Sequence, residues 1–281
     1  MLVYISADME GIAGVTTLDQ IVRGGSGYAR AQALMTAEAN AAIRGAFAGG
    51  ASEVVISDSH GTMDNLLVDQ LDPRARLVNG GPRPSCMAQG LSARATLAVF
   101  LGYHAAAGAP GVLSHTFSVN FTEMRINGRQ TSEAEVNALY AASKAVPIGV
   151  LTGDDQICEV ARKAFPGVIT VETKHAVGWS AAESLHPERA GWAIEAAVES
   201  AVSETERFVA PLPPDELIVE VDFACTLGAD YAASMPGSRR IRPNTLAYDA
   251  ADVDRLLQAI MSWYYLAALS AQQVSAVAHR R

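Results

Sequence analysis

The sequence of 281 residues contains few cysteines, no long apolar run and no basic stripe. Its three cysteines, Cys86, Cys158 and Cys225, are an odd number at wide spacing, so they indicate neither a disulfide framework nor a CxxC metal knuckle. No stretch reaches the roughly 18 apolar residues of a membrane-spanning helix, and the first residues lack the basic and apolar regions of a secretory signal. We therefore expect a protein of a reducing compartment, with the cytoplasm as the default and no membrane partner.

Positive charge is also scarce. The chain has 21 Lys and Arg against 30 Asp and Glu, a formal net charge of −9, and its basic residues are scattered. This balance argues against a nucleic-acid partner. Hydrophobic residues make up 49% and charged residues 18%, a composition that is typical of a folded globular protein and argues strongly against intrinsic disorder.

Apolar runs alternate with alanine-rich stretches through the first two thirds of the chain, which predicts a mostly parallel sheet covered by helices. The fold class we expect is α/β, a three-layer sandwich with a mostly parallel central sheet, plus a smaller α+β lobe. The predicted strands are Leu2–Ala7, Glu53–Ser57, Thr96–Gly102, Ile148–Leu151 and Val168–Val171, and the predicted helices are Tyr28–Ala48, Glu133–Ala145, Asp155–Phe165 and Glu188–Glu206.

The clearest linker is the proline-rich segment Ala210–Glu216, because clustered prolines end a helix and cannot join a central ladder. It predicts a larger α/β domain over residues 1–209 and the smaller lobe over residues 216–281. Within the larger domain, the dipeptide Asn127-Gly128 predicts a tight turn and an antiparallel hairpin near residues 113–131.

The smaller lobe opens with "LIVEVDF", which alternates like a half-exposed strand. Val253–Leu269 predicts an amphipathic helix, and the last eight residues, "VSAVAHRR", predict a frayed tail.

Three of the predicted core strands finish on side chains that can bind metals. The first is followed by Asp8 and Glu10, the second by Asp58 and His60, and the third by His104. Ligands of open α/β sheets lie at the carboxyl ends of the strands, so these side chains are expected to converge. Carboxylate oxygen and imidazole nitrogen suit Zn²⁺, and a carboxylate can bridge two ions. The larger domain is therefore the candidate metal-binding catalytic domain.

Single residues also have plainer interpretations. His60 alone fits a hydrogen-bonded polar residue, and Asp58 fits an Asx-turn. Glu133 and Glu135 offer further carboxylates at a predicted helix start, where acids also complement the helix dipole. His115 in "PGVLSHT" fits a general base, an electrophile that stabilises an oxyanion, or an inert loop residue.

An ordered set of motifs resembles the DppA-type D-aminopeptidases, peptidase family M55. The motifs are "ADMEGIAG", "SDSHG" followed by "MDNLL", "LGYHA", "PGVLSHT" and "INGR", and the similarity runs along nearly the whole chain, including "MPG". The resemblance implies a binuclear zinc enzyme with two Zn²⁺ per subunit and with His115 in the catalytic role. The implied metal ligands, of which Asp8 is the bridge, are Asp8, Glu10, His60, His104 and Glu133.

The same resemblance implies a ring-shaped homodecamer that cleaves D-amino acids such as D-Ala from the N-termini of short peptides. In such a site a carboxylate such as Glu135 or Asp154 would bind the ammonium group of the peptide. The chain departs from the family after Lys174, where relatives often carry an arginine in the following turn and this sequence has Trp179. If Trp179 lines the site, the substrate specificity of this protein differs from that of its relatives. The resemblance therefore implies metal-dependent hydrolysis more directly than it implies a preference for D-amino acids.

The sequence leaves two alternatives to a D-aminopeptidase. One is another binuclear metallohydrolase or amidohydrolase with a different stereopreference. The other is a non-catalytic peptide-binding module, which the two-lobed organisation would also suit.

Overall fold

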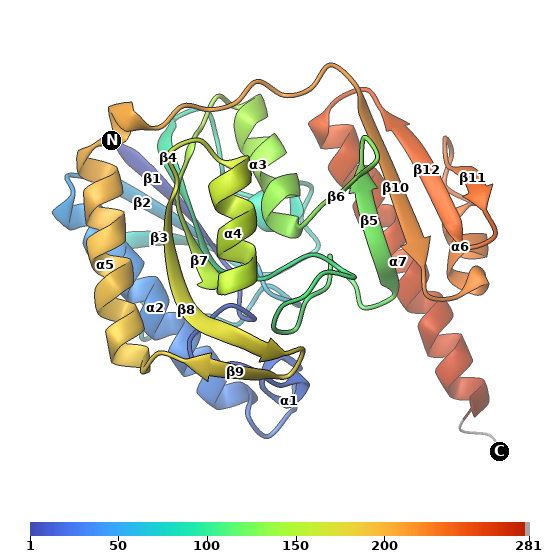
Figure 1. The fold of residues 1–281 in the computed structure, drawn as a ribbon, viewed down its shortest axis with the longest axis horizontal. Coiled ribbons are helices and arrows are strands. Elements are labelled where there is room, and N and C mark those ends of the chain that lie inside the picture. Colours follow the sequence, from blue (N-terminus) through green and yellow to red (C-terminus); the bar gives the residue numbers. More distant parts are fainter. Residues whose placement is uncertain (279–281) are drawn as a thin grey trace. The chain divides into compact units, whose positions relative to one another are not determined.

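The computed structural model describes residues 1–278, and the chain divides into two compact units (Figure 1). Unit 1 consists of Met1–Ala105, Pro110–Ser114 and Ala134–Pro213. Unit 2 consists of Ala106–Ala109, His115–Glu133 and Pro214–Arg281. One division falls inside the proline-rich segment, and the others fall between residues 105 and 134.

Unit 1 is built on a seven-stranded sheet with the order β3-β2-β1-β4-β7-β8-β9. Neighbouring strands are parallel except for β8 and β9, which form an antiparallel hairpin. The expected mostly parallel sheet is confirmed. The strands are β1 (Leu2–Ala7), β2 (Glu53–Asp58), β3 (Ala75–Val78), β4 (Ala95–Tyr103), β7 (Ile148–Asp154), β8 (Ile169–Gly178) and β9 (Ala181–Ser184).

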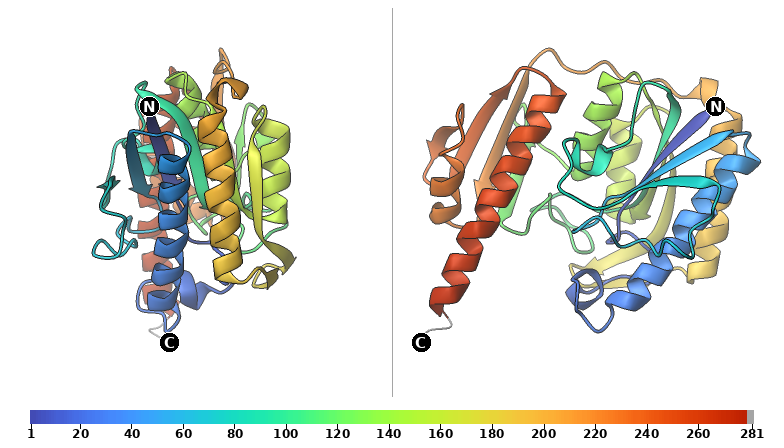
Figure 2. Two further views of the ribbon diagram at one scale, coloured as in Figure 1. Left: turned by 90° about the vertical axis from the view of Figure 1, so that its left-hand side faces the viewer. Right: turned by 180° about the vertical axis from the view of Figure 1, so that it is seen from behind.

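Helices cover both faces of this sheet, as the paired views show (Figures 1 and 2). α2 and α5 pack together on one face, and α3 and α4 lie on the other. The contact of α2 with α5 depends on Gly45, because a Cβ at that position would lie 2.3 Å from the carbonyl oxygen of Glu195. The helices are α1 (Leu18–Ile21), α2 (Tyr28–Ala48), α3 (Glu133–Ser143), α4 (Asp155–Ala164) and α5 (Pro187–Ser203).

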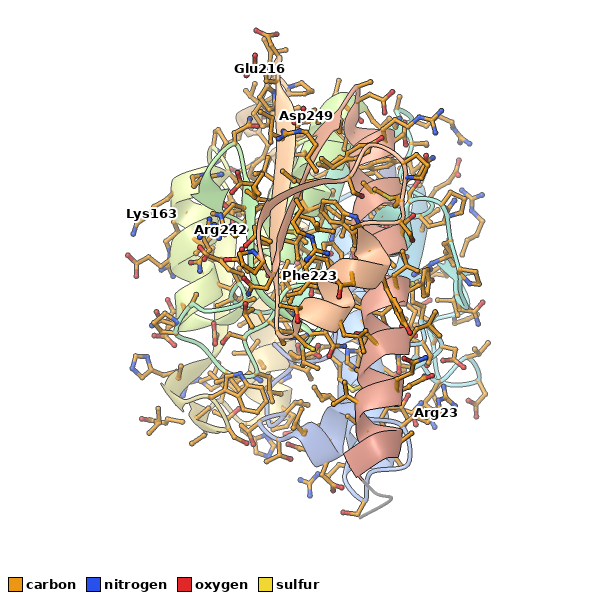
Figure 3. The ribbon with its side chains drawn as sticks, turned by 90° about the vertical axis from the view of Figure 1, so that its right-hand side faces the viewer. Arg23, Lys163, Glu216, Phe223, Arg242 and Asp249 are labelled. Atoms are coloured by element: carbon orange, nitrogen blue, oxygen red, sulfur yellow. The ribbon has the colours of Figure 1, made fainter. Side chains whose placement is uncertain are left out.

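Unit 2 is built on a five-stranded antiparallel sheet with the order β11-β12-β10-β5-β6. β10 alternates between buried and half-buried residues, as predicted. In the core of this unit, the ring centroid of Trp263 lies 6.3 Å from that of Phe223, which Figure 3 labels. The elements are β5 (Phe121–Ile126), β6 (Arg129–Gln130), β10 (Leu217–Phe223), α6 (Thr226–Ala232), β11 (Arg239–Arg242), β12 (Thr245–Ala250) and α7 (Val253–Ala278).

Two features of unit 2 differ from the sequence analysis. The predicted turn at Asn127-Gly128 is confirmed, with φ of +51° and +76°, but its hairpin pairs with β10 in unit 2 and does not belong with residues 1–209. α7 continues to Ala278, so the prediction of a frayed tail is wrong for residues 274–278. Residues 279–281 of that predicted tail lie outside the described residues. No helix within residues 1–278 has both the length and the apolar character needed to cross a membrane.

Candidate metal centre

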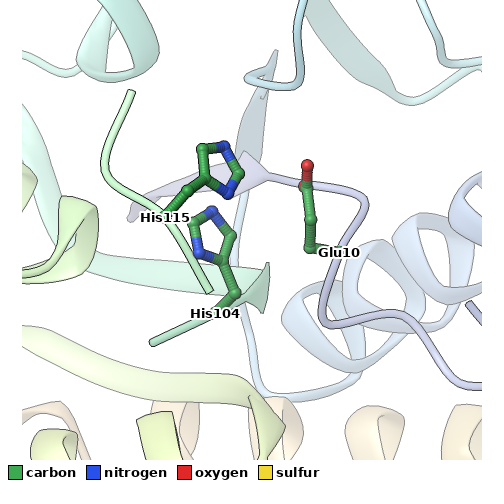
Figure 4. A group of neighbouring side chains, drawn as sticks. All are labelled: Glu10, His104 and His115. Carbon is green, nitrogen blue, oxygen red and sulfur yellow. The ribbon is translucent and has the colours of Figure 1, made fainter. Parts of the chain in front are cut away.

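The carboxyl ends of β1, β2 and β4 are adjacent in unit 1, because these parallel strands are neighbours in the sheet. Asp8 and Glu10 follow β1, and His60 follows β2; Figure 4 shows Glu10 and the imidazole of His104, which follows β4. The four residues are buried, with exposed fractions of 2%, 1%, 7% and 1% in chain order. The structure therefore brings together four of the predicted site residues within one unit.

Two glycines allow the loop after β1 to approach β4. The amide of Gly11 donates to the carbonyl oxygen of Gly102 at 2.7 Å, and a Cβ on Gly11 would lie 2.2 Å from Tyr103 O. Gly102 has a φ of +71°, and a Cβ there would lie 2.3 Å from Asp8 O. Because any larger residue would push the two segments apart, these glycines hold the carboxylate loop against the strand that precedes His104.

Asp8 presents its two carboxylate oxygens to two different imidazoles. Its Oδ1 lies 3.4 Å from His60 Nδ1, and its Oδ2 lies 3.4 Å from His104 Nε2. Glu10 Oε2 lies 3.0 Å from the same nitrogen of His60, and one ligand atom from each of Asp8, Glu10 and His60 lies within 4.8 Å of the others. Two donors on one tetrahedral zinc ion are about 3.3 Å apart, so this spacing fits a zinc site.

Backbone carbonyls orient both histidines. His60 Nε2 lies 2.7 Å from Ile21 O, and His104 Nδ1 lies 3.0 Å from Ala105 O. A carbonyl can only accept a hydrogen bond, so each of these nitrogens carries the proton of the neutral ring. In the neutral form of each ring, which is the form that binds a metal, the lone pair of the other nitrogen faces Asp8, and this is how proteins orient metal-binding histidines.

The two buried carboxylates of the cluster favour a positive charge beside them. Burial disfavours protonation of His60, but the carboxylates of Glu10 and Asp8 outweigh it and hold the pKa of His60 well above its ordinary value. A divalent cation meets the same demand and leaves the imidazole neutral. Two carboxylates and two imidazoles in a buried group are therefore a donor set that fits zinc.

The other two predicted site residues, His115 and Glu133, belong to unit 2. His115 Nε2 lies 3.8 Å from Glu133 Oε1, and the same oxygen accepts a hydrogen bond of 2.5 Å from the amide of Phe117. Both residues adjoin unit 1 along the chain. His115 follows Ser114 of unit 1, and Glu133 is the first residue of α3, whose remaining residues belong to unit 1.

Asp58, also at a strand end, organises the loop that follows it. Its Oδ2 accepts hydrogen bonds from the amides of Asn65 and Leu66 at 2.5 and 2.7 Å. Its Oδ1 accepts from the side chain of Asn65 at 2.8 Å and, in the manner of an Asx-turn, from the amide of His60 at 3.4 Å. The plainer interpretation of Asp58 is confirmed.

Sequence reasoning missed a buried lysine beside the site. Lys174 Nζ donates to the carbonyl oxygens of Glu10, at 2.5 Å, and of Val15, while Glu38 accepts from the amide of Ala13 at 2.8 Å. Burial lowers the pKa of Lys174 to about 8 and raises that of Glu38 to about 7. A signal was present in the sequence, because Glu38 interrupts the apolar stripe of α2, where a charge requires a partner.

An α/β unit that gathers carboxylates and imidazoles at the carboxyl ends of parallel strands has the architecture of a metal-binding enzyme of the α/β class. The chain belongs to the D-aminopeptidase family of M55 peptidases, whose family model matches residues 1–262. The family resemblance seen in the sequence is thereby confirmed.

One relative and one solved structure support the assignment. The chain is 35% identical over 262 residues to a D-aminopeptidase of Bacillus subtilis (strain 168), covering 93% of this chain and 96% of the relative. It also matches the structure of the Zn-dependent D-aminopeptidase DppA from Bacillus subtilis, a self-compartmentalizing protease, with a TM-score of 0.92 and 34% identity. That match covers 95% of this chain and 98% of the other, which confirms the predicted fold class.

Proposed function

We propose that this protein is a zinc-dependent D-aminopeptidase that removes N-terminal D-amino acids, such as D-Ala, from short peptides. The observation that carries the proposal is the buried group of Asp8, Glu10, His60 and His104 at one edge of the parallel sheet. Its support from relatives is the similarity to a D-aminopeptidase and to a Zn-dependent one of known structure.

The proposed centre holds two zinc ions per subunit. Asp8 is the proposed bridge, because its two oxygens face two imidazoles. Glu10, His60 and His104 supply further ligands from unit 1, and Glu133 completes the set. The support for Glu133 is its place at the start of α3, directly before the part of that helix that belongs to unit 1.

Zinc held by these residues would supply Lewis-acid polarisation of the scissile carbonyl and would lower the pKa of a water molecule toward neutrality. His115 stabilises the developing oxyanion or passes a proton to the leaving amine, and direct attack by its imidazole is the alternative role. Glu135 or Asp154 is the proposed carboxylate that binds the peptide ammonium, and Asp154 also caps α4 and accepts a hydrogen bond from the amide of Val112.

Paired alanyl dipeptides test the activity. Zinc-loaded protein should hydrolyse D-Ala-D-Ala faster than L-Ala-L-Ala, and N-acetylation of the substrate should abolish cleavage. Equal hydrolysis of blocked peptides would show that the enzyme is not an aminopeptidase. Turnover of phosphate esters in place of peptides would favour a different metallohydrolase, and tight binding of peptide without turnover would favour a binding module.

His115→Ala tests the catalytic role of the histidine. The variant should lose turnover while it keeps the zinc content of the parent, measured by elemental analysis. Unchanged turnover with intact zinc would remove His115 from the mechanism.

The proposed assembly is a homodecameric ring, and the proposed location is the cytoplasm. The first is supported by the similarity to a self-compartmentalizing protease, and the second by the three free cysteines, which suit a reducing compartment. Light scattering of the purified protein measures the mass of the particle. A monomer at micromolar concentration would contradict the ring.

A further inference from the structure

The tip of the β8–β9 hairpin contacts the segment that leads to His115. The amide of Leu113 donates to the carbonyl oxygen of Trp179 at 2.8 Å, and the indole Nε1 of Trp179 donates to Ser114 O at 3.2 Å. Both contacts lie within unit 1, and Ser114 is the residue directly before His115. Trp179 is 43% exposed, so its indole is not a core side chain.

The segment that Trp179 contacts has a constrained backbone. Leu113 is fully buried and has a φ of +54°, a left-handed conformation that a branched residue keeps only when its surroundings hold it. The preceding amide, of Val112, donates to Asp154 Oδ2 at 2.7 Å. Three successive residues are therefore held by specific hydrogen bonds, and Trp179 provides two of the three.

The same hairpin holds the loop that carries Glu10. Lys174, in β8, donates to Glu10 O at 2.5 Å. Ser180, the neighbour of Trp179, donates from its hydroxyl to Thr16 O at 3.0 Å. The β8–β9 hairpin thus makes two sets of contacts. Lys174 and Ser180 bind the loop that carries Glu10, and Trp179, at the tip of the hairpin, binds the segment before His115.

We propose that Trp179 is a positioning residue for the catalytic step. By holding Leu113 and Ser114 to the hairpin that also holds the Glu10 loop, it fixes the point of unit 1 from which His115 continues. This inference rests on the catalytic role proposed for His115. A misplaced general acid or oxyanion donor lowers the rate of the chemical step while ground-state binding of the peptide persists.

Two substitutions separate hydrogen bonding from packing. Trp179→Phe keeps an aromatic ring and removes the indole N–H, so kcat should fall roughly tenfold, the equivalent of one hydrogen bond, with KM and zinc content unchanged. Trp179→Arg restores a long N–H donor and should recover most of that loss. The reverse order, with Phe active and Arg impaired, would show a packing role and overturn the proposal.

Hydrogen exchange supplies a readout that does not depend on turnover. A peptide covering residues 110–116 should exchange faster in Trp179→Phe than in the parent. Trp192→Phe is the matched control, since Trp192 is 69% exposed on α5, and it should change neither exchange nor kcat. Parent-like exchange and kcat in Trp179→Phe would overturn the proposal.

The same experiments distinguish failure of the proposed function from failure of this inference. If His115→Ala retains full turnover, the catalytic role of His115 is wrong, and a positioning role through it is wrong as well. If His115→Ala is inactive while Trp179→Phe is fully active, only the role of Trp179 is wrong.

Discussion

The two units compensate their clustered acids in different ways. In unit 2, Arg125 is 8% exposed and its guanidinium lies 3.0 Å from Glu220, 3.0 Å from Asp222 and 2.7 Å from Glu123. Hydrogen bonds with Asp222 raise the pKa of Arg125, and those from Arg125 lower the pKa of Asp222. The positive charge in this cluster is permanent, because a guanidinium does not lose its proton in proteins.

In unit 1, the groups facing the carboxylates of Asp8 and Glu10 are imidazoles, whose charge depends on protonation. Acids compensated by a fixed guanidinium form a structural cluster. Imidazoles that face acids compensate them only when the rings bind protons or when a cation binds between them and the acids. The comparison therefore indicates that the identity of the positive partner, more than the number of acids, distinguishes a candidate metal centre from a structural ion pair.

The largest effect is expected for Asp8→Asn. The amide keeps the shape of the side chain but loses the charge that binds zinc, so zinc content and kcat/KM should fall together, the latter roughly 10³-fold. Elemental analysis and dipeptide hydrolysis measure the two losses. The matched change Asp222→Asn in unit 2 should leave zinc content intact. Full zinc occupancy in Asp8→Asn would break the distinction between the two clusters.

Lys174→Met should have the next largest effect. It removes a buried donor from two carbonyls of the loop that carries Glu10, which should cost about 3 kcal/mol of stability and weaken zinc binding roughly 10- to 100-fold. Thermal unfolding and a zinc competition titration measure these changes. Lys163→Met is the control, because the Lys163 side chain is 74% exposed and its ion pair with Glu159 contributes little. Zinc affinity equal to that of the parent would show that the loop holds its position without Lys174.

Local patterns were enough to predict much of unit 1. The apolar run Leu2–Ala7 and the alanine-rich stretch Tyr28–Ala48 match β1 and α2 in both bounds. β8 continues to Gly178, beyond the predicted end at Val171. The outer half was not predicted because it is largely polar, and it forms a strand by pairing with β9. β3 was missed because four half-buried or exposed residues carry no strong apolar signal.

Local sequence patterns could not predict strand pairing or side-chain burial that depends on residues far away in the chain. Turn chemistry identified the hairpin at Asn127-Gly128, but its partner strand, β10, begins ninety residues later, and no local pattern selects it. The convergence of Asp8, Glu10, His60 and His104 could be predicted, because one rule places the ends of parallel strands together. Lys174 could be predicted only in part, since the buried Glu38 indicates that a charged partner exists, but which lysine is buried depends on which loop covers the sheet at that point.

A smaller effect is expected for Asp222→Asn in unit 2. The substitution weakens the charge-assisted hydrogen bonds with Arg125, and because the site is partly solvated the loss should be about 1–2 kcal/mol. Urea unfolding can be followed by the fluorescence of Trp263, which is fully buried in the same unit. Catalytic constants should be unchanged. A fall in zinc content would mean that the two clusters are not independent.

The smallest effect is the pH dependence of that stability difference. Hydrogen bonds from Arg125 lower the pKa of Asp222 below its usual value of 3.8, so the folded protein binds this proton less readily than the unfolded chain. The stabilisation is then fully present above the unfolded pKa and is lost as pH falls through the folded pKa. The difference in urea midpoint between the parent and Asp222→Asn should stay constant from about pH 8 to 5 and shrink below about pH 4. A difference that persists unchanged to pH 2 would mean that packing, and not charge, sets the contribution of Asp222, and the contrast between a fixed and a conditional counter-charge would lose its support in unit 2.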